Sequence, residues 1–288
     1  MSALVAVLRY HHPHARITQS GPTVQVVFTH EGLWHSARIR TRPVAEIYVG
    51  APGFGDFTLA VQQGDWLQRL LHDGPVVGKR LIRTNDRELA RLWLDERSMA
   101  ALDGAVERVW WSFDLAGGEL AVLKGAPEED PEPVHDALLA GATLVAASHR
   151  VAARWLTVAR ALGGTTSGDR WTLDGDFAVT CERGGVAVRI DNVRQRPGER
   201  SDHHRLRTRV AARRLPTSGS DTAIAQRLAA APALLAAAGS VAPEIHRGEI
   251  ALWYEGLVTQ VERLTAAADL CARLAVDVAS AASGGPYR

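Results

Sequence analysis

Cysteine is scarce in this chain, which has only Cys181 and Cys271 in 288 residues. Two cysteines are too few for a disulfide framework, and such scarcity is typical of a reducing compartment. Long apolar runs are also missing, because no stretch approaches the roughly 18 uninterrupted apolar residues of a membrane-spanning helix. The opening MSALVAVLRYHHPH has no basic region and only a short apolar run, so no signal peptide is expected. We therefore expect a soluble, cytoplasmic protein without membrane insertion.

The chain has no large excess of positive or negative charge. It contains 33 basic and 32 acidic residues, and its formal net charge is +1. No global field would concentrate polyanions such as nucleic acid around the protein. Any anion binding must therefore come from a local patch. Hydrophobic content of 46% and charged content of 23% are ordinary for a folded chain, which is long enough for one large domain or two ordinary ones.

Motifs that carry catalytic or cofactor chemistry are missing as well. The loop GAPGFGDF, at 50–57, has neither the lysine of a Walker loop nor the following helix of a dinucleotide fingerprint. No GxSxG elbow occurs. Cys181 alternates with Phe177 and Val179 on an apolar strand face, which favours a buried thiol over a nucleophile. No catalytic residue and no cofactor are predicted.

Histidine is more abundant, with 11 copies, and His11, His12 and His14 stand together near the start. With His203 and His204 they could build a metal site if the two loops met. However, no HExxH pattern occurs, and zinc sites usually combine defined spacing with cysteine or acidic companions. Solvent-exposed histidines are the preferred interpretation, so no metal site is predicted. The remaining histidines that we interpret as structural are His135, His149 and His246.

The sequence does contain a pattern that occurs twice in the same order. GELAVLKG at 118–125 matches GEIALWYEG at 248–256, and VQVVFTHEGLWHSARIR matches FAVTCERGGVAVRID as two strands around a glycine turn. Asp86 and Asp221 begin two helical segments that Gly104 and Gly239 end, and each pair is 135 residues apart (221 − 86 and 239 − 104). We interpret the pattern as a tandem duplication.

Each repeat combines strands with helices. Alternating apolar residues predict two strands, a helix capped by Asp86 follows, and a hairpin turning at Gly117-Gly118 precedes a long helix after PEEDPEP. We predict an α+β fold of two tandem pseudo-equivalent units, each a mainly antiparallel sheet with flanking helices. The expected divisions are an N-terminal segment 1–15, a first unit 16–162, a linker 163–170 and a second unit 171–288.

The long helix of each unit has an apolar seam at alternating spacings of four and three. Packing on the unit's own sheet is the preferred interpretation, and packing of the two helices on each other or on a second chain is the alternative. The first unit also has an extra segment, 64–83, where the second has only LPTSGS. The two units are therefore not equivalent in detail.

The stretch SDHHRLRTRVAARR, at 201–214, is the strongest local charge signal. Strand parity places four arginines on one side and the apolar or small residues between them on the other. The preceding hairpin loop adds further arginines. The surface predicted to bind an anion or a partner comprises Arg194, Arg196, Arg205, Arg207, Arg209 and Arg213.

Three interpretations of this arginine ladder stay open, of which the first, a solvated strand face, is preferred. Its side chains can pair with acidic residues such as Glu182, Asp191 or the PEEDPEP segment and simply solvate a strand. They can contact the phosphates of a nucleic acid, or they can contact an acidic protein partner. Strand parity also places Trp34, Trp253 and one of the adjacent Trp110 and Trp111 outward, and exposed aromatic residues beside arginines are typical of protein interfaces.

The run from KRLIRTNDRELARLWL to WWSFDLAGGELAVLKG resembles a group of uncharacterised bacterial proteins of unknown function. In that group an F-V-x-x-x-D strand precedes an alanine- and leucine-rich helix and a glycine-turn hairpin. Here Leu81-Ile82 stand where an aromatic residue is expected, and the membrane helices of many group members are missing. The resemblance implies no catalytic residues.

These observations predict a non-enzymatic binding or scaffold protein that acts through protein–protein contacts. One alternative is an enzyme whose site lies between the units without a linear motif. The other is a nucleic-acid-binding protein that uses the arginine-rich strand. Homo-oligomerisation stays open.

Overall fold

In the computed structural model, the described residues are 3–51, 57–64, 76–77, 80–109, 111–124, 126–168, 177–195, 205–213, 242–246 and 248–282, with a few isolated positions between 222 and 239. They divide into two compact units, up to Arg150 and from Val151 onward. Within the described ranges, no helix combines the length and hydrophobicity needed to cross a bilayer.

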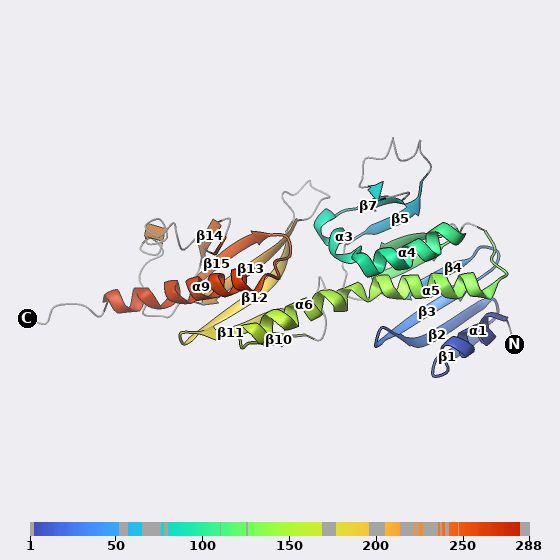
Figure 1. Cartoon of the computed structure of the whole chain (residues 1–288), viewed down its shortest axis with the longest axis horizontal. Coiled ribbons are helices and arrows are strands. Elements are labelled where there is room, and N and C mark those ends of the chain that lie inside the picture. Colours follow the sequence, from blue (N-terminus) through green and yellow to red (C-terminus); the bar gives the residue numbers. More distant parts are fainter. Residues whose placement is uncertain are drawn as a thin grey trace, which may run out of the picture. The chain divides into compact units, whose positions relative to one another are not determined.

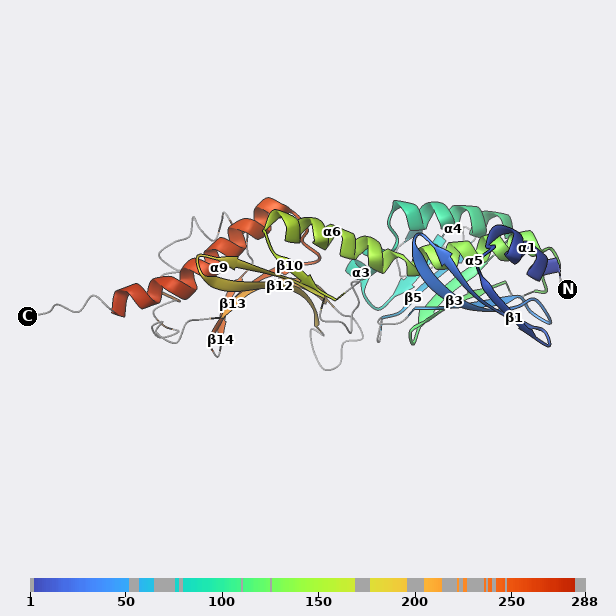
Figure 2. The same cartoon turned by 90° about the horizontal axis from the view of Figure 1, so that it is seen from below.

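The first unit is a nine-stranded antiparallel sheet of order β1-β2-β3-β4-β9-β8-β5-β7-β6. Figure 1 labels β1 to β5 and β7 of this sheet. The strands are β1 (Arg16–Ser20), β2 (Thr23–His30), β3 (Leu33–Arg40), β4 (Glu46–Gly50), β5 (Leu59–Gln63), β6 (Val76–Val77), β7 (Arg80–Thr84), β8 (Ser112–Ala116) and β9 (Glu119–Leu123). The helices are α1 (Ala3–His11), α3 (Arg87–Trp93), α4 (Glu96–Val109) and α5 (Pro131–Val145). In Figure 2, α1, α4 and α5 lie on one side of this sheet.

The second unit is a six-stranded antiparallel sheet of order β10-β11-β12-β13-β15-β14. The strands are β10 (Thr165–Ser167), β11 (Ala178–Arg183), β12 (Val186–Gln195), β13 (Arg205–Arg213), β14 (Ala242–His246) and β15 (Glu249–Glu255). The helices are α6 (Ala147–Ala161), which joins this unit from Val151 onward, and α9 (Val261–Ala282). Figure 2 shows both helices along one side of the sheet.

Local sequence explains where these elements begin and turn. Asp86 caps α3 by accepting a hydrogen bond from the backbone N–H of Leu89 at 3.0 Å, as its position predicted. Asp130 caps α5, with Pro131 as the first helical residue. The hairpins β2–β3, β8–β9 and β11–β12 all turn through two consecutive residues of positive φ, which favours the tight turns that match strand twist.

Together the two sheets and their helices confirm the predicted α+β class. The order β1-β2-β3-β4-β9-β8 in the first sheet corresponds to β10-β11-β12-β13-β15-β14 in the second. The matched sequence segments fall on corresponding strands, β2–β3 with β11–β12 and β9 with β15. This agreement supports the duplication hypothesis. The first sheet also contains β5, β7 and β6, with 64–83 contributing β6 and most of β7.

Two expected divisions differ from the structure. Residues 1–15 do not stand apart, because α1 packs on α5 and buries Leu8. The long helix predicted to close the first unit is two helices, and the units divide between Arg150 and Val151 rather than at 163–170. The reason is burial: Trp155 of α6 is fully buried and packs edge-on to Phe177 of the second unit.

Helices α5 and α9 pack on the sheet of their own unit, as preferred from the sequence, whereas the later part of the first seam lies in α6 and belongs to the second unit. In α5, Gly141 allows close approach to β4 and β9, because an added Cβ would lie 3.2 Å from Val49 and 3.1 Å from Val122. In the second unit, α9 packs on β11, β12, β13 and β15. Burial of these apolar faces is the main stabilising contribution to each unit.

Candidate binding surface

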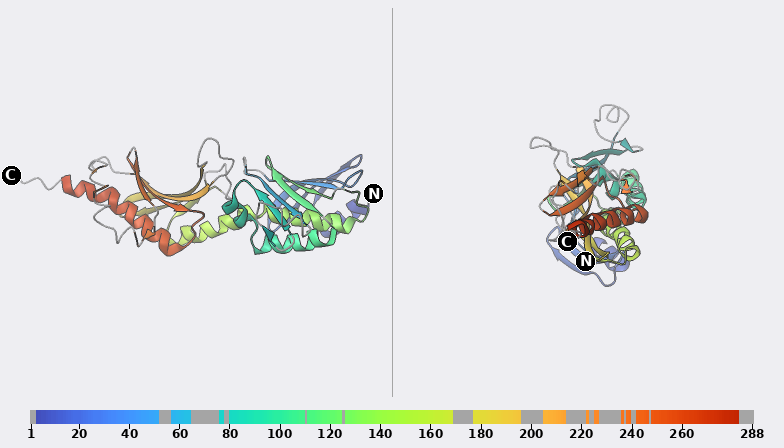
Figure 3. Two further views of the ribbon diagram at one scale, coloured as in Figure 1. Left: turned by 90° about the horizontal axis from the view of Figure 1, so that it is seen from above. Right: turned by 90° about the vertical axis from the view of Figure 1, so that its left-hand side faces the viewer.

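The β13 members of the arginine ladder (Arg205, Arg207, Arg209 and Arg213) lie on the face of the second sheet opposite α9. Figure 3 shows α9, in red, along the other face of that sheet. Leu206, Thr208 and Val210 of β13 are buried under the helix. The side chains of Arg207 and Arg209 alternate with them and are half-buried on the other face. The predicted strand parity of 205–213 is therefore confirmed.

Arg209 holds Asp191 across the β12–β13 pair, where the two residues lie directly opposite each other. Its Nε donates to Oδ1 at 3.0 Å and its Nη2 to Oδ2 at 2.8 Å, while Nη1 donates to Glu249 at 3.1 Å. Arg189 adds a further bond to Asp191 at 2.9 Å. Burial alone would raise the pKa of Asp191, but the hydrogen bonds from Arg209 and Arg189 outweigh it and lower that pKa.

Trp253 lies beside these guanidinium groups. The guanidinium carbon of Arg207 is 4.8 Å from the indole ring centre and that of Arg209 is 5.9 Å away. The indole Nε1 donates to Glu244 at 2.8 Å, and only 8% of the residue is exposed. Trp253 does face away from the helices as predicted, yet the arginines cover it, so the expectation of an exposed ring is wrong.

The remaining arginines of the predicted surface differ in environment. Arg207 pairs with Glu255 at 3.3 Å, whereas Arg205 and Arg213, at the two ends of β13, are exposed and contact no carboxylate among the described residues. Arg194 is paired with the buried Leu206, so it belongs to the helix-covered side of the sheet and not to the ladder, contrary to the prediction; Arg196 is outside the described residues. Of the four arginines on β13, Arg207 and Arg209 thus pair with carboxylates of the same sheet, and Arg205 and Arg213 are exposed.

This face, which we call the arginine–tryptophan face, carries charges of both signs around one indole. Such a mixture suits contact with a protein surface, where aromatic and arginine side chains are enriched. Its members are Arg189, Asp191, Arg205, Arg207, Arg209, Arg213, Glu244, Glu249, Trp253 and Glu255.

The other expected surface tryptophans divide between exposure and burial. Trp34 of β3 is 69% exposed, in agreement with strand parity. Trp111 is 1% exposed and Trp110 is outside the described residues.

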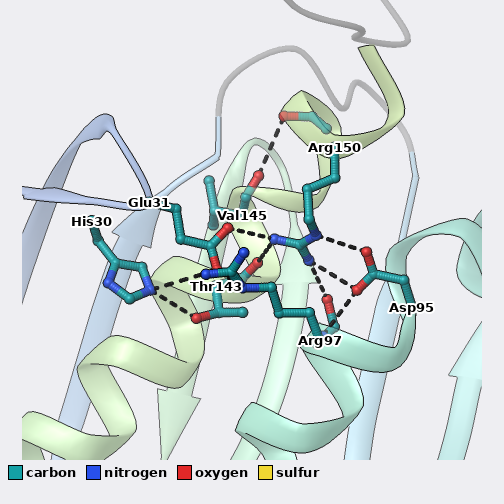
Figure 4. A network of polar contacts seen from close by, with 9 residues as sticks. His30, Glu31, Asp95, Arg97, Thr143, Val145 and Arg150 are labelled. Atoms are coloured by element: carbon teal, nitrogen blue, oxygen red, sulfur yellow. Dashed lines mark hydrogen bonds and ion pairs between the residues drawn. The ribbon is translucent and has the colours of Figure 1, made fainter. Parts of the chain in front are cut away.

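A second polar network lies in the first unit, centred on Arg150 (Figure 4). Its guanidinium donates to both carboxylate oxygens of Asp95 at 2.7 and 3.0 Å, to Glu31 at 2.8 Å and to the backbone oxygen of Thr143 at 3.1 Å. Burial alone would raise the pKa of Asp95, but the hydrogen bonds from Arg150 and Ser98 outweigh it and lower that pKa. The network ties the β2–β3 turn, the start of α4 and the end of α5 together.

Sequence reasoning did not find this network. Glu31 and Asp95 lie 64 residues apart (95 − 31), and Arg150 lies 55 residues beyond Asp95 (150 − 95). The one local indication of the network was the predicted hairpin turn at Glu31-Gly32. This turn places the Glu31 carboxylate at the end of the sheet.

The histidines group differently from the expectation. His11 and His12 meet His135 of α5, whereas His203 and His204 lie outside the described residues. His12 Nε2 is 3.1 Å from His135 Nε2, and the His11 and His135 rings stack at 4.2 Å between centres. Burial, followed by the neighbouring histidines, lowers the pKa of His135 to about 4. His14, by contrast, is exposed, as predicted.

Both thiols are buried, in agreement with the sequence-based interpretation of Cys181. Burial raises the pKa of Cys181 and raises that of Cys271 to about 12. Both sulfurs are therefore protonated at neutral pH, and a protonated thiol is a weak nucleophile.

Comparisons with known proteins add little to this geometry. No family model matches the chain, and no curated protein matches it. Among solved structures, the mycobacterial trehalose monomycolate transport factor A, TtfA, is similar with a TM-score of 0.32 and 11% identity. The match covers 44% of this chain and 74% of that one, and it carries no argument about function.

Proposed function

We propose that the chain is a non-enzymatic, cytoplasmic binding or scaffold protein that contacts a protein partner through the arginine–tryptophan face. The observation that carries the proposal is the arrangement around Trp253, where two guanidinium groups flank the indole on the sheet face opposite the helices. Arginine and tryptophan are the side chains that most often dominate protein–protein binding energy.

The charge pattern favours a protein over a nucleic acid. Arg207 and Arg209 are already engaged by Glu255, Asp191 and Glu249, so they have fewer N–H groups left for phosphates. A phosphate backbone would also approach these carboxylates and be repelled by them. A protein surface can instead offer acidic groups to Arg205 and Arg213 and polar or cationic groups to the carboxylates.

The test compares two variants of the full chain with matched charge changes. Arg205→Gln/Arg213→Gln removes the two exposed arginines from the arginine–tryptophan face. Arg154→Gln/Arg160→Gln removes two exposed arginines from α6 in the same unit. Affinity for a protein isolated from the native host on the wild-type chain is then measured at several salt concentrations.

The first variant should weaken binding by about two- to tenfold and flatten its salt dependence, because exposed ion pairs contribute about 0.2–1 kcal/mol each. The α6 variant should bind as the wild type does. Equal affinity of all three proteins would refute the proposed surface. Salt-dependent binding of labelled DNA or RNA that only the first variant loses would favour the nucleic-acid alternative instead.

A further inference from the structure

A group of imidazole and carboxylate side chains lies where α1 ends and α5 begins. His11, Glu132 and His135 each offer one potential ligand atom, and these atoms all lie within 4.8 Å of one another. Glu132 and His135 are three residues apart on α5, so they project from the same side of the helix. His11 is the last residue of α1, and this helix packs on α5.

We infer that His11, Glu132 and His135 form a binding site for a divalent transition-metal ion, with zinc as the best-suited ion. Two imidazole nitrogens and one carboxylate oxygen are a donor set that zinc accepts. Such a set also selects against calcium and magnesium, which prefer oxygen ligands. The site is independent of the arginine–tryptophan face, since all of its residues belong to the first unit.

The three proposed ligands differ in how far they are exposed and can move. His135 is 4% exposed and fixed within the unit, whereas the side chains of His11 and Glu132 are 36% and 57% exposed and can adjust to an ion. His11 Nε2 already lies 3.5 Å from Glu132 Oε2. The stacked rings of His11 and His135 must rotate relative to each other for both to bind one ion, and the exposed His11 is the one free to do so.

The neighbouring His12 supports the position of the His135 ring. His12 Nε2 lies 3.1 Å from His135 Nε2 and also packs on Phe28, so it holds the His135 ring from the protein side. A neighbour of this kind orients a ligating histidine and fixes its tautomer.

The position at a helix N-terminus would by itself disfavour a cation. The positive end of the α5 dipole is offset here by two carboxylates of its first turn, the cap Asp130 and the ligand Glu132. A bound ion would therefore fasten α1 to α5 and stabilise the folded first unit by mass action.

The experiment titrates Zn²⁺ into the untagged, EDTA-treated full chain by isothermal titration calorimetry, with Co²⁺ absorption as a second readout. His11→Asn and Glu132→Gln remove exposed ligands without disturbing the core, and circular dichroism verifies that both variants fold. His14→Asn is the matched control, because His14 is exposed and close in sequence but outside the three-residue group.

Wild type and His14→Asn should bind one equivalent of Zn²⁺. His11→Asn and Glu132→Gln should each bind it about tenfold or more weakly, since losing even an outer partner of a ligand costs about 10- to 100-fold. Zn²⁺ should also raise the melting temperature of the wild type and not that of the two ligand variants. Failure of the wild type to bind Zn²⁺, or unchanged affinity in both ligand variants, would overturn the inference.

Discussion

Arg209 and Asp191 form a two-point hydrogen-bonded pair across neighbouring strands, with donor–acceptor distances of 3.0 and 2.8 Å. Asp191 is 8% exposed, so its charge is removed from water and depends on Arg209 and Arg189 for compensation. The pair belongs to the candidate binding surface and also stabilises the sheet. Replacing Arg209 would therefore change the stability of the sheet as well as binding. Replacing the exposed Arg205 would test binding without this effect on stability.

Arg209→Gln is expected to lower the free energy of unfolding of the second unit by about 2 kcal/mol, because it leaves a buried carboxylate only partly compensated. Arg205→Gln, on the same strand, should change it by less than about 0.5 kcal/mol because Arg205 is exposed. Urea denaturation of the three proteins measures the difference. Equal stability of both variants would show that the pair contributes nothing.

Acid should destabilise the protein through Asp191 and Asp95. The pKa of each is lowered in the folded state, so the stability that they contribute is fully present above the unfolded pKa of about 3.9. It is lost as pH falls through the lower, folded pKa. The free energy of unfolding, measured between pH 6 and the acid transition, should fall less steeply with decreasing pH in Asp191→Asn than in the wild type. The reason is that asparagine does not take up the proton that the Asp191 carboxylate takes up in acid.

Thr208→Val is expected to destabilise the second unit by about 2 kcal/mol, although the two side chains have nearly the same shape. The buried hydroxyl donates to Gly256 O at 2.8 Å and accepts from Val258 N at 2.9 Å. Valine would leave both backbone groups without this partner. Thr208→Ser keeps the hydroxyl and should cost clearly less, so a similar loss in both variants, measured by thermal denaturation, would contradict the assignment.

Arg150→Gln should destabilise the first unit by about 2 kcal/mol or more, because it breaks the contacts to Asp95 and Glu31 shown in Figure 4. Hydrogen exchange should show the loss as faster exchange in the β2–β3 turn and at the start of α4. The exposed Arg154→Gln, one turn further along α6, is the control and should exchange as the wild type does.

The duplication hypothesis predicts that the backbones of the two units superpose element by element. Strands β2, β3, β4 and β9 with helix α5 should fall on β11, β12, β13 and β15 with α9. A superposition that pairs the strands in a different order, or that reverses the helix, would contradict a common ancestral unit.

Much of the fold could be predicted because its signals are local. Period-two alternation identified β2, β3, β12 and β13, and the glycine turns placed the β2–β3 and β11–β12 hairpins. The end of α5 could not be predicted, since the apolar seam continues smoothly into α6. The tertiary structure places the boundary between the units after Arg150, and beyond it Trp155 is buried against Phe177, a contact that no local pattern encodes.

The sequence by itself determined the fold class, the strand parity of β13 and the buried state of Cys181. Each of these follows from neighbouring residues, whose side-chain directions are set by the period of the strand or helix. Only the tertiary structure decided which side chains meet across 40 or more residues. It covered Trp253 with Arg207 and Arg209, and it brought His135 to His11, because contacts between elements depend on how strands pair and helices dock.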